Sequence, residues 1–324
     1  GVNINGGSEK VAYFVQFNGQ NQDGIYTNSS TNYNQFNVRS NVDIKLTKSF
    51  TIGVDLNARQ QHKDYSAYGA GSDIFYVGLK LKPGGAMYYP NGMLRSGDSN
   101  PAALVSPICG YNNTTINSTA ATFKANWDLD FITKGLRAYA LVTFYNRVYS
   151  SVSQTMTPFL YSIVGHTMNP DGTYTYDMYQ AQQGNTYMST GRSQDGLREL
   201  SLQGKIDYSR EFGKHDVGAT LVYHQKETVY NIADSEEYAS LPYREQGIAG
   251  RLTYSYAKRY MVEANFGYNG SENFAPGHRF GFFPSIAGGW VISNEPFFAP
   301  LKNTVNLLKV RASYGLVGND VISS

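Results

Sequence analysis

The sequence predicts an all-β protein, an antiparallel up-and-down sheet that crosses a membrane as a β-barrel. Three observations lead to this prediction: apolar and polar residues alternate along most of the chain, very short connections alternate with long ones, and aromatic residues gather near the ends of the predicted strands. Alternation with a period of two is typical of a strand with one apolar and one polar face. We count about a dozen such strands, several of them longer than the five or six residues usual in soluble proteins.

The alternating segments recur along the whole chain. In residues 34–46, Phe36, Val38, Val42, Ile44 and Leu46 share one face, and polar side chains share the other. No segment shows a convincing helical stripe, so we expect no helix. The further apolar faces are Phe50, Ile52, Val54 and Leu56; Phe123, Ala125, Trp127, Leu129 and Phe131; Leu200, Leu202, Ile206 and Tyr208; Val217, Ala219, Leu221 and Tyr223; Ile248, Leu252, Tyr254 and Tyr256; and Tyr260, Val262, Ala264, Phe266 and Tyr268.

The connections between these segments alternate in length. Every second connection of an up-and-down meander lies at the same end of the sheet, so one end is expected to be tight and the other to carry elaborate loops. This asymmetry is typical of outer-membrane barrels, which have short periplasmic turns and long extracellular loops. The short connections are 47–49, 133–135, 212–216 and 257–259, and the long ones are 20–32, 63–120, 149–196, 229–241 and the shorter 270–278.

Soluble sandwiches and propellers are the alternative, because they also contain alternating strands. Strand length, loops elaborated at one end, and aromatic residues near the strand ends favour the membrane barrel. Tyr254, Tyr256 and Tyr260 flank one tight turn, whereas Tyr268 and Phe280 lie at the opposite end. Aromatic girdles of a membrane barrel occupy these two levels.

The alternation also predicts which face of the sheet each residue occupies. In the hairpin 260–292 we expect Phe280, Phe282, Phe283 and Trp290 to face lipid, and Glu263 and Arg279 to point inward. In the earlier strands, the residues expected to face lipid are Phe36, Val38, Val42, Phe50, Ile52, Val54, Trp127 and Leu129, and those expected to face the lumen are Arg39, Asp43, Lys45, Lys124, Asp128 and Asp130.

Composition excludes several functional classes. The chain has 324 residues, 16% of them charged, and a formal net charge of +2, so no nucleic-acid partner is expected. A single cysteine, Cys109, and five dispersed histidines form no catalytic or metal-binding spacing, so we expect neither an enzyme nor a cofactor. Residues 169–177 have oxygens that could hold calcium, but Asn-Pro-Asp-Gly is also an ordinary turn signal, and we prefer the turn.

Two parts of the chain closely resemble one family. Residues 241–298 and 307–320, together with 6–25 and 37–56, are similar to the barrel of SusC/RagA-type TonB-linked outer-membrane receptors of Bacteroidetes. The resemblance implies that the whole chain is the middle portion of one plugged barrel of roughly 22 strands. It places the plug and the remaining strands outside this segment, so we expect the edge strands near residues 2–6 and 308–316 to pair with polypeptide beyond it.

The resemblance also implies a function. Such a receptor imports oligosaccharides or oligopeptides through the outer membrane of a bacterial cell. Its partners are a SusD-like surface lipoprotein and the TonB complex, which it reaches through the missing N-terminal part. Two alternatives remain: a passive porin or secretion barrel, which lacks a plug and a TonB-box, and a soluble carbohydrate-binding β-protein, which would not need detergent for extraction.

The long loops are the expected place for cargo or lid contacts. Aromatic rings beside polar side chains suit sugar stacking or peptide capture, although the same tyrosines could equally pack the loops against each other. The candidates in loops 63–120 and 149–196 are Tyr65, Tyr68, Tyr88, Tyr89, Tyr111, Tyr161, Tyr174 and Tyr176.

Overall fold

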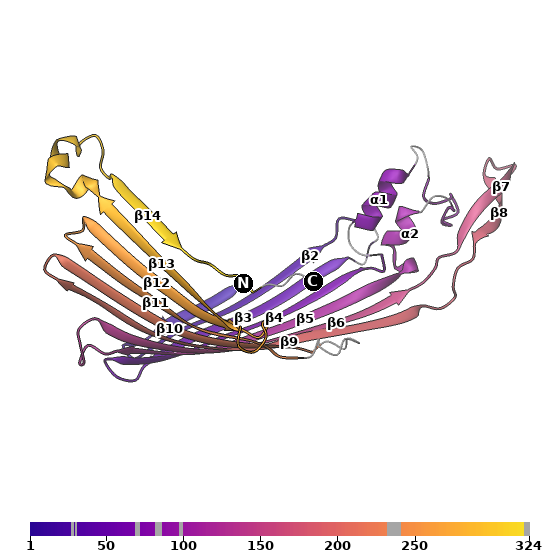
Figure 1. Cartoon of the computed structure of the whole chain (residues 1–324). Coiled ribbons are helices and arrows are strands. Elements are labelled where there is room, and N and C mark those ends of the chain that lie inside the picture. Colours follow the sequence, from indigo (N-terminus) through magenta and orange to yellow (C-terminus); the bar gives the residue numbers. More distant parts are fainter. Residues whose placement is uncertain are drawn as a thin grey trace.

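Twelve antiparallel strands form one curved sheet in the computed structural model, and two further strands form a separate hairpin (Figure 1). The structure describes residues 1–26, 29, 31–68, 72–81, 86–96, 100–231 and 241–320. Neighbouring strands follow chain order, which confirms the up-and-down meander. The main sheet contains β1 (Val2–Gly7), β2 (Val11–Asp23), β3 (Asn32–Lys45), β4 (Phe50–Ser66), β5 (Gly110–Asp128), β6 (Leu136–Thr155), β9 (Ser189–Phe212), β10 (His215–Tyr230), β11 (Tyr243–Tyr256), β12 (Tyr260–Ser271), β13 (Phe280–Val291) and β14 (Lys309–Gly315).

The long connections contain structure that the sequence patterns did not predict. Strands β4 and β5 extend into the expected loop 63–120, so the connection between them is 67–109. It holds α1 (Ser72–Lys80), α2 (Pro101–Val105) and the 3-10 helix η1 (Pro107–Cys109). The expectation of no helix was therefore wrong, because these helices are too short to show a periodic stripe. The expected loop 149–196 likewise contains the ends of β6 and β9 and a hairpin of β7 (Leu160–Met168) and β8 (Tyr174–Gln182).

The tight end of the sheet has one exception. The short connections at 47–49, 133–135, 212–216 and 257–259 are confirmed as turns between paired strands. However, β13 and β14 are joined at this end by residues 292–308, with η2 (Ile292–Asn294) and η3 (Pro296–Leu301), so the predicted strict alternation fails there. Of the connection expected at 229–241, residues 232–240 lie outside the described residues.

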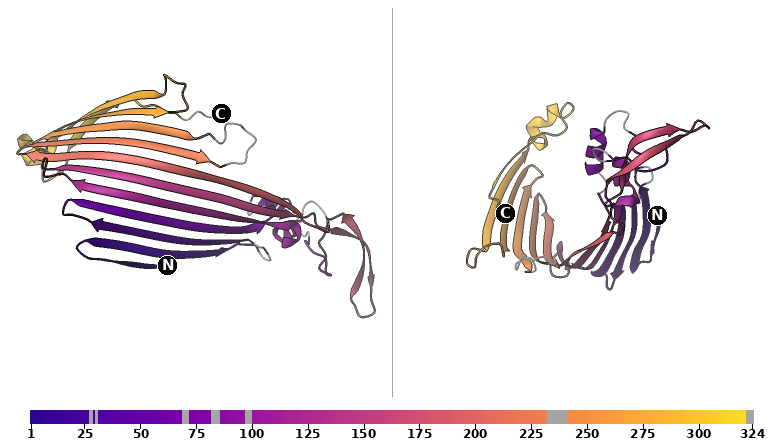
Figure 2. Two further views of the ribbon diagram at one scale, coloured as in Figure 1. Left: turned by 90° about the horizontal axis from the view of Figure 1, so that it is seen from below. Right: turned by 90° about the vertical axis from the view of Figure 1, so that its right-hand side faces the viewer.

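The sheet curves into an open trough (Figure 2). Its edges are β1 and β14, and these two strands do not pair with each other within the described part of the chain. No helix among the described residues is long and apolar enough to cross a membrane.

The polar face of the sheet is the concave one. Lys124 of β5 reaches across Gly53 of β4 to Asp43 of β3 (3.5 Å) and also contacts Asp55 (2.9 Å), so these charges share one face. Clefts of about 730 and 510 Å³ open on the same face, along β6 and β9 to β14. A single sheet encloses space only on its concave side, so the charged residues line the lumen.

The convex face carries an exposed apolar belt. Phe123 of β5 is 55% exposed and Trp127 is 45% exposed, although both are large and apolar. On β3 the belt runs outward from Ile44 to Phe36, which is about 26 Å along the strand and roughly 20 Å in height at a tilt of about 40°. Such a height and composition match the lipid-facing band of a transmembrane barrel.

Two predicted orientations need correction. Asp130 lies beyond the end of β5 in the turn to β6, where its carboxylate accepts a hydrogen bond from the Gly135 backbone N–H (2.7 Å). It therefore belongs to neither face of the sheet. Phe283 was expected to face lipid, but it lies between the outward residues Phe282 and Pro284, so its side chain is on the lumenal face.

A small apolar core lies in the loop between β4 and β5. It consists of Leu94, Ala103, Cys109 and, from the start of β7, Leu160. Asn100 holds this loop together: its side-chain oxygen accepts from the backbone N–H groups of Ala102 and Ala103, and its amide donates to the carbonyls of Met87 and Arg95. Figure 1 shows α1 and α2 on the concave side at the end of the sheet opposite the tight turns.

The face assignment predicts opposite environments for nearby positions of β4. In the membrane-embedded full-length protein, a spin label at Val54 should be reached by a lipid-soluble quencher, and one at Asn57 by an aqueous quencher. Val54→Arg should cost about 2–4 kcal/mol and Asn57→Arg much less, since only the first places a charge in hydrocarbon. The opposite pattern of quenching would reverse the two faces.

Asn100 provides a test of the loop packing. Asn100→Ala removes a helix cap and two further hydrogen bonds from a side chain that is 8% exposed, so it should destabilise the 67–109 loop by about 1–3 kcal/mol. Limited proteolysis should then cut within this loop faster than in the wild type. Asn57→Ala, on an exposed position of β4, is the matched control and should leave the cleavage rate unchanged. Equal rates for Asn100→Ala and wild type would contradict the assignment.

Cys109 should be chemically inert in the folded protein. It is fully buried, and burial raises the pKa of its thiol to about 11, so almost no thiolate is present at pH 8. A maleimide at pH 8 should label it only after denaturation. Rapid labelling of the native protein at pH 8 would show that this core is open.

Candidate functional site

Both faces of the sheet become polar towards the end with the long connections. On the outer face of β4, Ala58 is the last apolar residue, and Gln60 and His62 follow it. Strands of 17 to 24 residues in β4, β5, β6 and β9 are longer than the roughly 9–11 residues needed to cross a membrane. These strands therefore extend beyond the hydrocarbon, and their projecting ends carry the loops.

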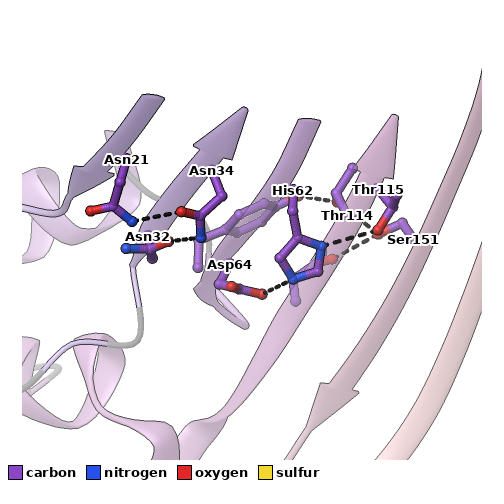
Figure 3. A network of polar contacts seen from close by, with 10 residues as sticks. Asn21, Asn32, Asn34, His62, Asp64, Thr114, Thr115 and Ser151 are labelled. Atoms are coloured by element: carbon purple, nitrogen blue, oxygen red, sulfur yellow. Dashed lines mark hydrogen bonds and ion pairs between the residues drawn. The ribbon is translucent and has the colours of Figure 1, made fainter. Parts of the chain in front are cut away.

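The projecting outer face carries a network of hydrogen bonds between strands (Figure 3). Asn21 of β2 donates to Asn34 of β3 (2.6 Å), and Asn34 donates in turn to Asn32. On β4, His62 lies 3.0 Å from the Thr115 hydroxyl through Nδ1 and 3.1 Å from the Asp64 carboxylate through Nε2. Of these contacts, Asn21–Asn34 and His62–Thr115 join neighbouring strands, so they fasten the sheet laterally above the apolar belt.

The lumenal face at the same height is covered by the 67–109 loop. Thr114 of β5 is 2% exposed, and its hydroxyl lies 3.1 Å from that of Ser151 and 3.3 Å from that of Tyr65. The Ser66 hydroxyl donates to the carbonyl of Leu104, which ties the end of β4 to α2. The loop is therefore fixed to the end of β4, whereas Tyr65 contacts Thr114, a residue of the neighbouring strand.

Three of the other candidate tyrosines meet within the loops. Tyr88 forms an isolated bridge with Leu94, and Tyr89 bonds through its backbone to Met93 (2.9 Å). Tyr161, at the start of β7, forms a bridge with Arg95, and its backbone N–H donates to the Leu94 carbonyl (3.0 Å). The two long connections thus contact each other around residues 88–95.

The remaining candidates lie apart from this contact. Tyr174 and Tyr176 belong to β8, where their rings lie 6.4 Å apart and the His166 ring lies 5.5 Å from that of Tyr174. Tyr68 follows β4 and is 45% exposed. Tyr111 belongs to strand β5, where it pairs with Gln154 on the outer face of the sheet. It therefore does not face the lumen. The structure therefore does not bring all eight tyrosines into one site.

The segment 169–177 folds as a turn. Asp171 accepts hydrogen bonds from the backbone N–H (3.0 Å) and the hydroxyl (2.7 Å) of Thr173, and Asn169 donates to the same hydroxyl (2.8 Å). The hydrogen bond from the Thr173 hydroxyl, followed by that from its backbone N–H, holds the pKa of Asp171 below its usual range. Its carboxylate closes the β7–β8 turn, in agreement with the preferred reading of the sequence.

Sequence reasoning missed a cleft on the lumenal side of β11 to β13. It is lined by His224, Glu245 and Phe283 from the strands, by Phe274 and Arg279 from the connection between β12 and β13, and by Asp320 from beyond β14. The sequence contained one signal for this cleft. Phe280 and Phe282 share the outer face, so strict alternation places the ring of Phe283 on the lumenal face.

Comparison with known proteins links the chain to one group of receptors. No family model matches it. It is 26% identical to the TonB-dependent receptor P3 of Formosa agariphila over 99% of this chain and 32% of that receptor. It is 38% identical to the TonB-dependent receptor SusC of Bacteroides thetaiotaomicron, over 22% of this chain and 7% of SusC. The chain thus spans about a third of the length of the curated receptors that it matches over nearly its full extent.

Solved structures support the same fold. The RagAB peptide transporter matches 99% of this chain and 36% of its own with a TM-score of 0.64 and 17% identity. The siderophore receptor PirA of Acinetobacter baumannii matches 90% of this chain and 38% of its own with a TM-score of 0.51 and 8% identity. The trough is therefore part of the wall of such a barrel. The chain is a segment of an outer-membrane β-barrel related in sequence to the TonB-dependent receptors and similar in sequence and fold to the SusC/RagA type.

Proposed function

We propose that the protein containing this chain imports oligosaccharides or oligopeptides across the bacterial outer membrane, driven by the TonB complex. The observation that carries this proposal is the similarity of 99% of the chain to a TonB-dependent receptor. The lumenal wall is polar, and several of its charges are paired, as in Lys124–Asp55 (2.9 Å) and Arg251–Glu263 (2.6 Å), which suits the passage of a polar cargo. Its partners are a SusD-like surface lipoprotein and the TonB complex.

The open edges support a barrel larger than this chain. In hydrocarbon each unpaired backbone group costs several kcal/mol, so the free edges of β1 and β14 are incompatible with an isolated trough in a membrane. We infer that further strands pair with both edges and that a plug fills the enclosed space. The isolated segment should accordingly not refold in detergent into a protease-resistant monomer with heat-modifiable gel migration, and such a monomer would show that it closes by itself.

Whole cells test the importer against the passive porin. A strain lacking the full-length gene should lose uptake of its oligosaccharide or oligopeptide cargo, and the restored gene should recover it. Removal of the TonB-box, or dissipation of the inner-membrane proton gradient, should abolish the recovered uptake. Uptake that persists after both treatments would establish a passive channel instead.

The contact between the two long loops is the proposed cargo or lid surface. Tyr88→Ala and Tyr161→Ala should lower uptake several-fold, because both residues lie where the loops meet above the lumen. Tyr111→Ala, on the outer face of β5, is the matched control and should leave uptake unchanged. Antibody access to residues 86–96 on intact cells should confirm their extracellular position. Access only after the outer membrane is breached would contradict it.

A further inference from the structure

Pro284 ends the pairing between β13 and β14. Its carbonyl accepts a hydrogen bond from the Leu316 backbone N–H (3.0 Å), but a proline has no N–H to return to the Leu316 carbonyl. The ladder cannot continue past this pair. Residues 316–320 therefore leave the sheet, and we call this segment the strap.

The strap turns inward over the lumenal face. A Cβ placed on Gly318 would lie 2.3 Å from the Phe283 ring, so only glycine permits this close approach. Beyond it, the Tyr243 hydroxyl donates to the Asp320 carboxylate (2.7 Å), and the Asn273 amide donates to the Asp320 carbonyl (2.8 Å). The strap is thereby fixed to β11 and to the connection between β12 and β13.

The strap closes one side of a cleft of about 350 Å³. Phe274 and Phe283 supply aromatic rings to its wall, and His224, Glu245, Arg279 and Asp320 supply the groups that can carry charge. The cleft faces the lumen, because His224 and Glu245 stand on the lumenal side of β10 and β11. A molecule passing through the barrel can therefore reach it.

Glu245 and Asp320 of this cleft form no ion pair with a described residue. The ammonium of Lys226, the cross-strand neighbour of Glu245, attracts this carboxylate but pairs with Glu199 (3.2 Å). Arg279 lines the cleft, but its guanidinium lies 3.9 Å from the carboxylate of Glu272, which is not part of the lining. Asp320 is bound by neutral donors, and hydrogen bonds from Tyr243 and Ser271 hold its pKa below the usual range. Within the described residues, Glu245 and Asp320 thus leave an excess of negative charge beside aromatic rings.

We propose that this cleft binds a cationic group of the cargo, an ammonium or guanidinium carried by an oligopeptide. A cation there would be neutralised by the two carboxylates and would also face the rings of Phe274 and Phe283, an arrangement that favours organic cations. The inference rests on the proposed import function and narrows its cargo.

Binding to the purified full-length receptor tests the proposal. The probes are three capped tripeptides, Ala-Lys-Ala, Ala-norleucine-Ala and Ala-Glu-Ala, and a neutral trisaccharide, each measured by calorimetry at pH 8. The lysine peptide should bind about tenfold more tightly than the norleucine peptide, and the glutamate peptide should bind most weakly. Equal affinities of the lysine and norleucine peptides, or tight binding of the trisaccharide alone, would overturn the proposal.

Variants assign the effect to the cleft. Glu245→Gln and Asp320→Asn should each reduce the preference for lysine over norleucine towards one. Glu227→Gln is the matched control, because Glu227 lies at a similar height on the outer face and pairs with Arg244 (2.6 Å). Heat-modifiable migration of each variant verifies folding. A preference for lysine that survives both cleft variants would show that the cation binds elsewhere. The import proposal is tested separately, by TonB-dependent uptake in cells.

Discussion

Lateral backbone pairing is the constraint on which the rest of this structure depends. Hydrocarbon offers no water to the backbone, so every N–H and C=O at that depth needs a partner on a neighbouring strand. The continuous ladder from β1 to β14 meets this need in the described part of the chain, except at the two edges. Strand order, turn positions and the inferred need for further strands all follow from it. Where Pro284 interrupts the ladder, the chain leaves the sheet and forms the strap on the lumenal face.

The two faces of the sheet carry side chains suited to different surroundings. On the convex face, large side chains such as Phe123 and Trp127 are exposed, which is stabilising only against lipid. On the concave face, Lys124 and its acidic neighbours meet above Gly53, where the absent side chain gives room for the contact. A glycine in the middle of a strand thus allows an ionic link across three strands.

The loops are organised by packing and by hydrogen bonds to the backbone. Asn100 alone joins four backbone groups of the 67–109 loop, and Ser66 attaches α2 of that loop to the end of β4. Tyr65 contacts Thr114 of the neighbouring strand. Tyr88 and Tyr161 form bridges to residues 94 and 95, where the two long connections meet, and they are the proposed contacts for cargo or a lid.

The sequence by itself determined most strands of the main sheet, their order and most of their faces, because a period of two and short polar turns are local signals that neighbouring strands must obey. Residues such as Val54 and Lys124 were assigned to opposite faces on that basis, and the register agrees. Tertiary structure decided the rest. The helices of the 67–109 loop are too short to show a helical stripe of apolar residues. The long 292–308 connection lies at the end of the sheet where short connections were expected, because up-and-down pairing does not fix the length of a connection. The cleft under the strap joins residues from β10 to residue 320, and only the folded sheet brings such distant positions together.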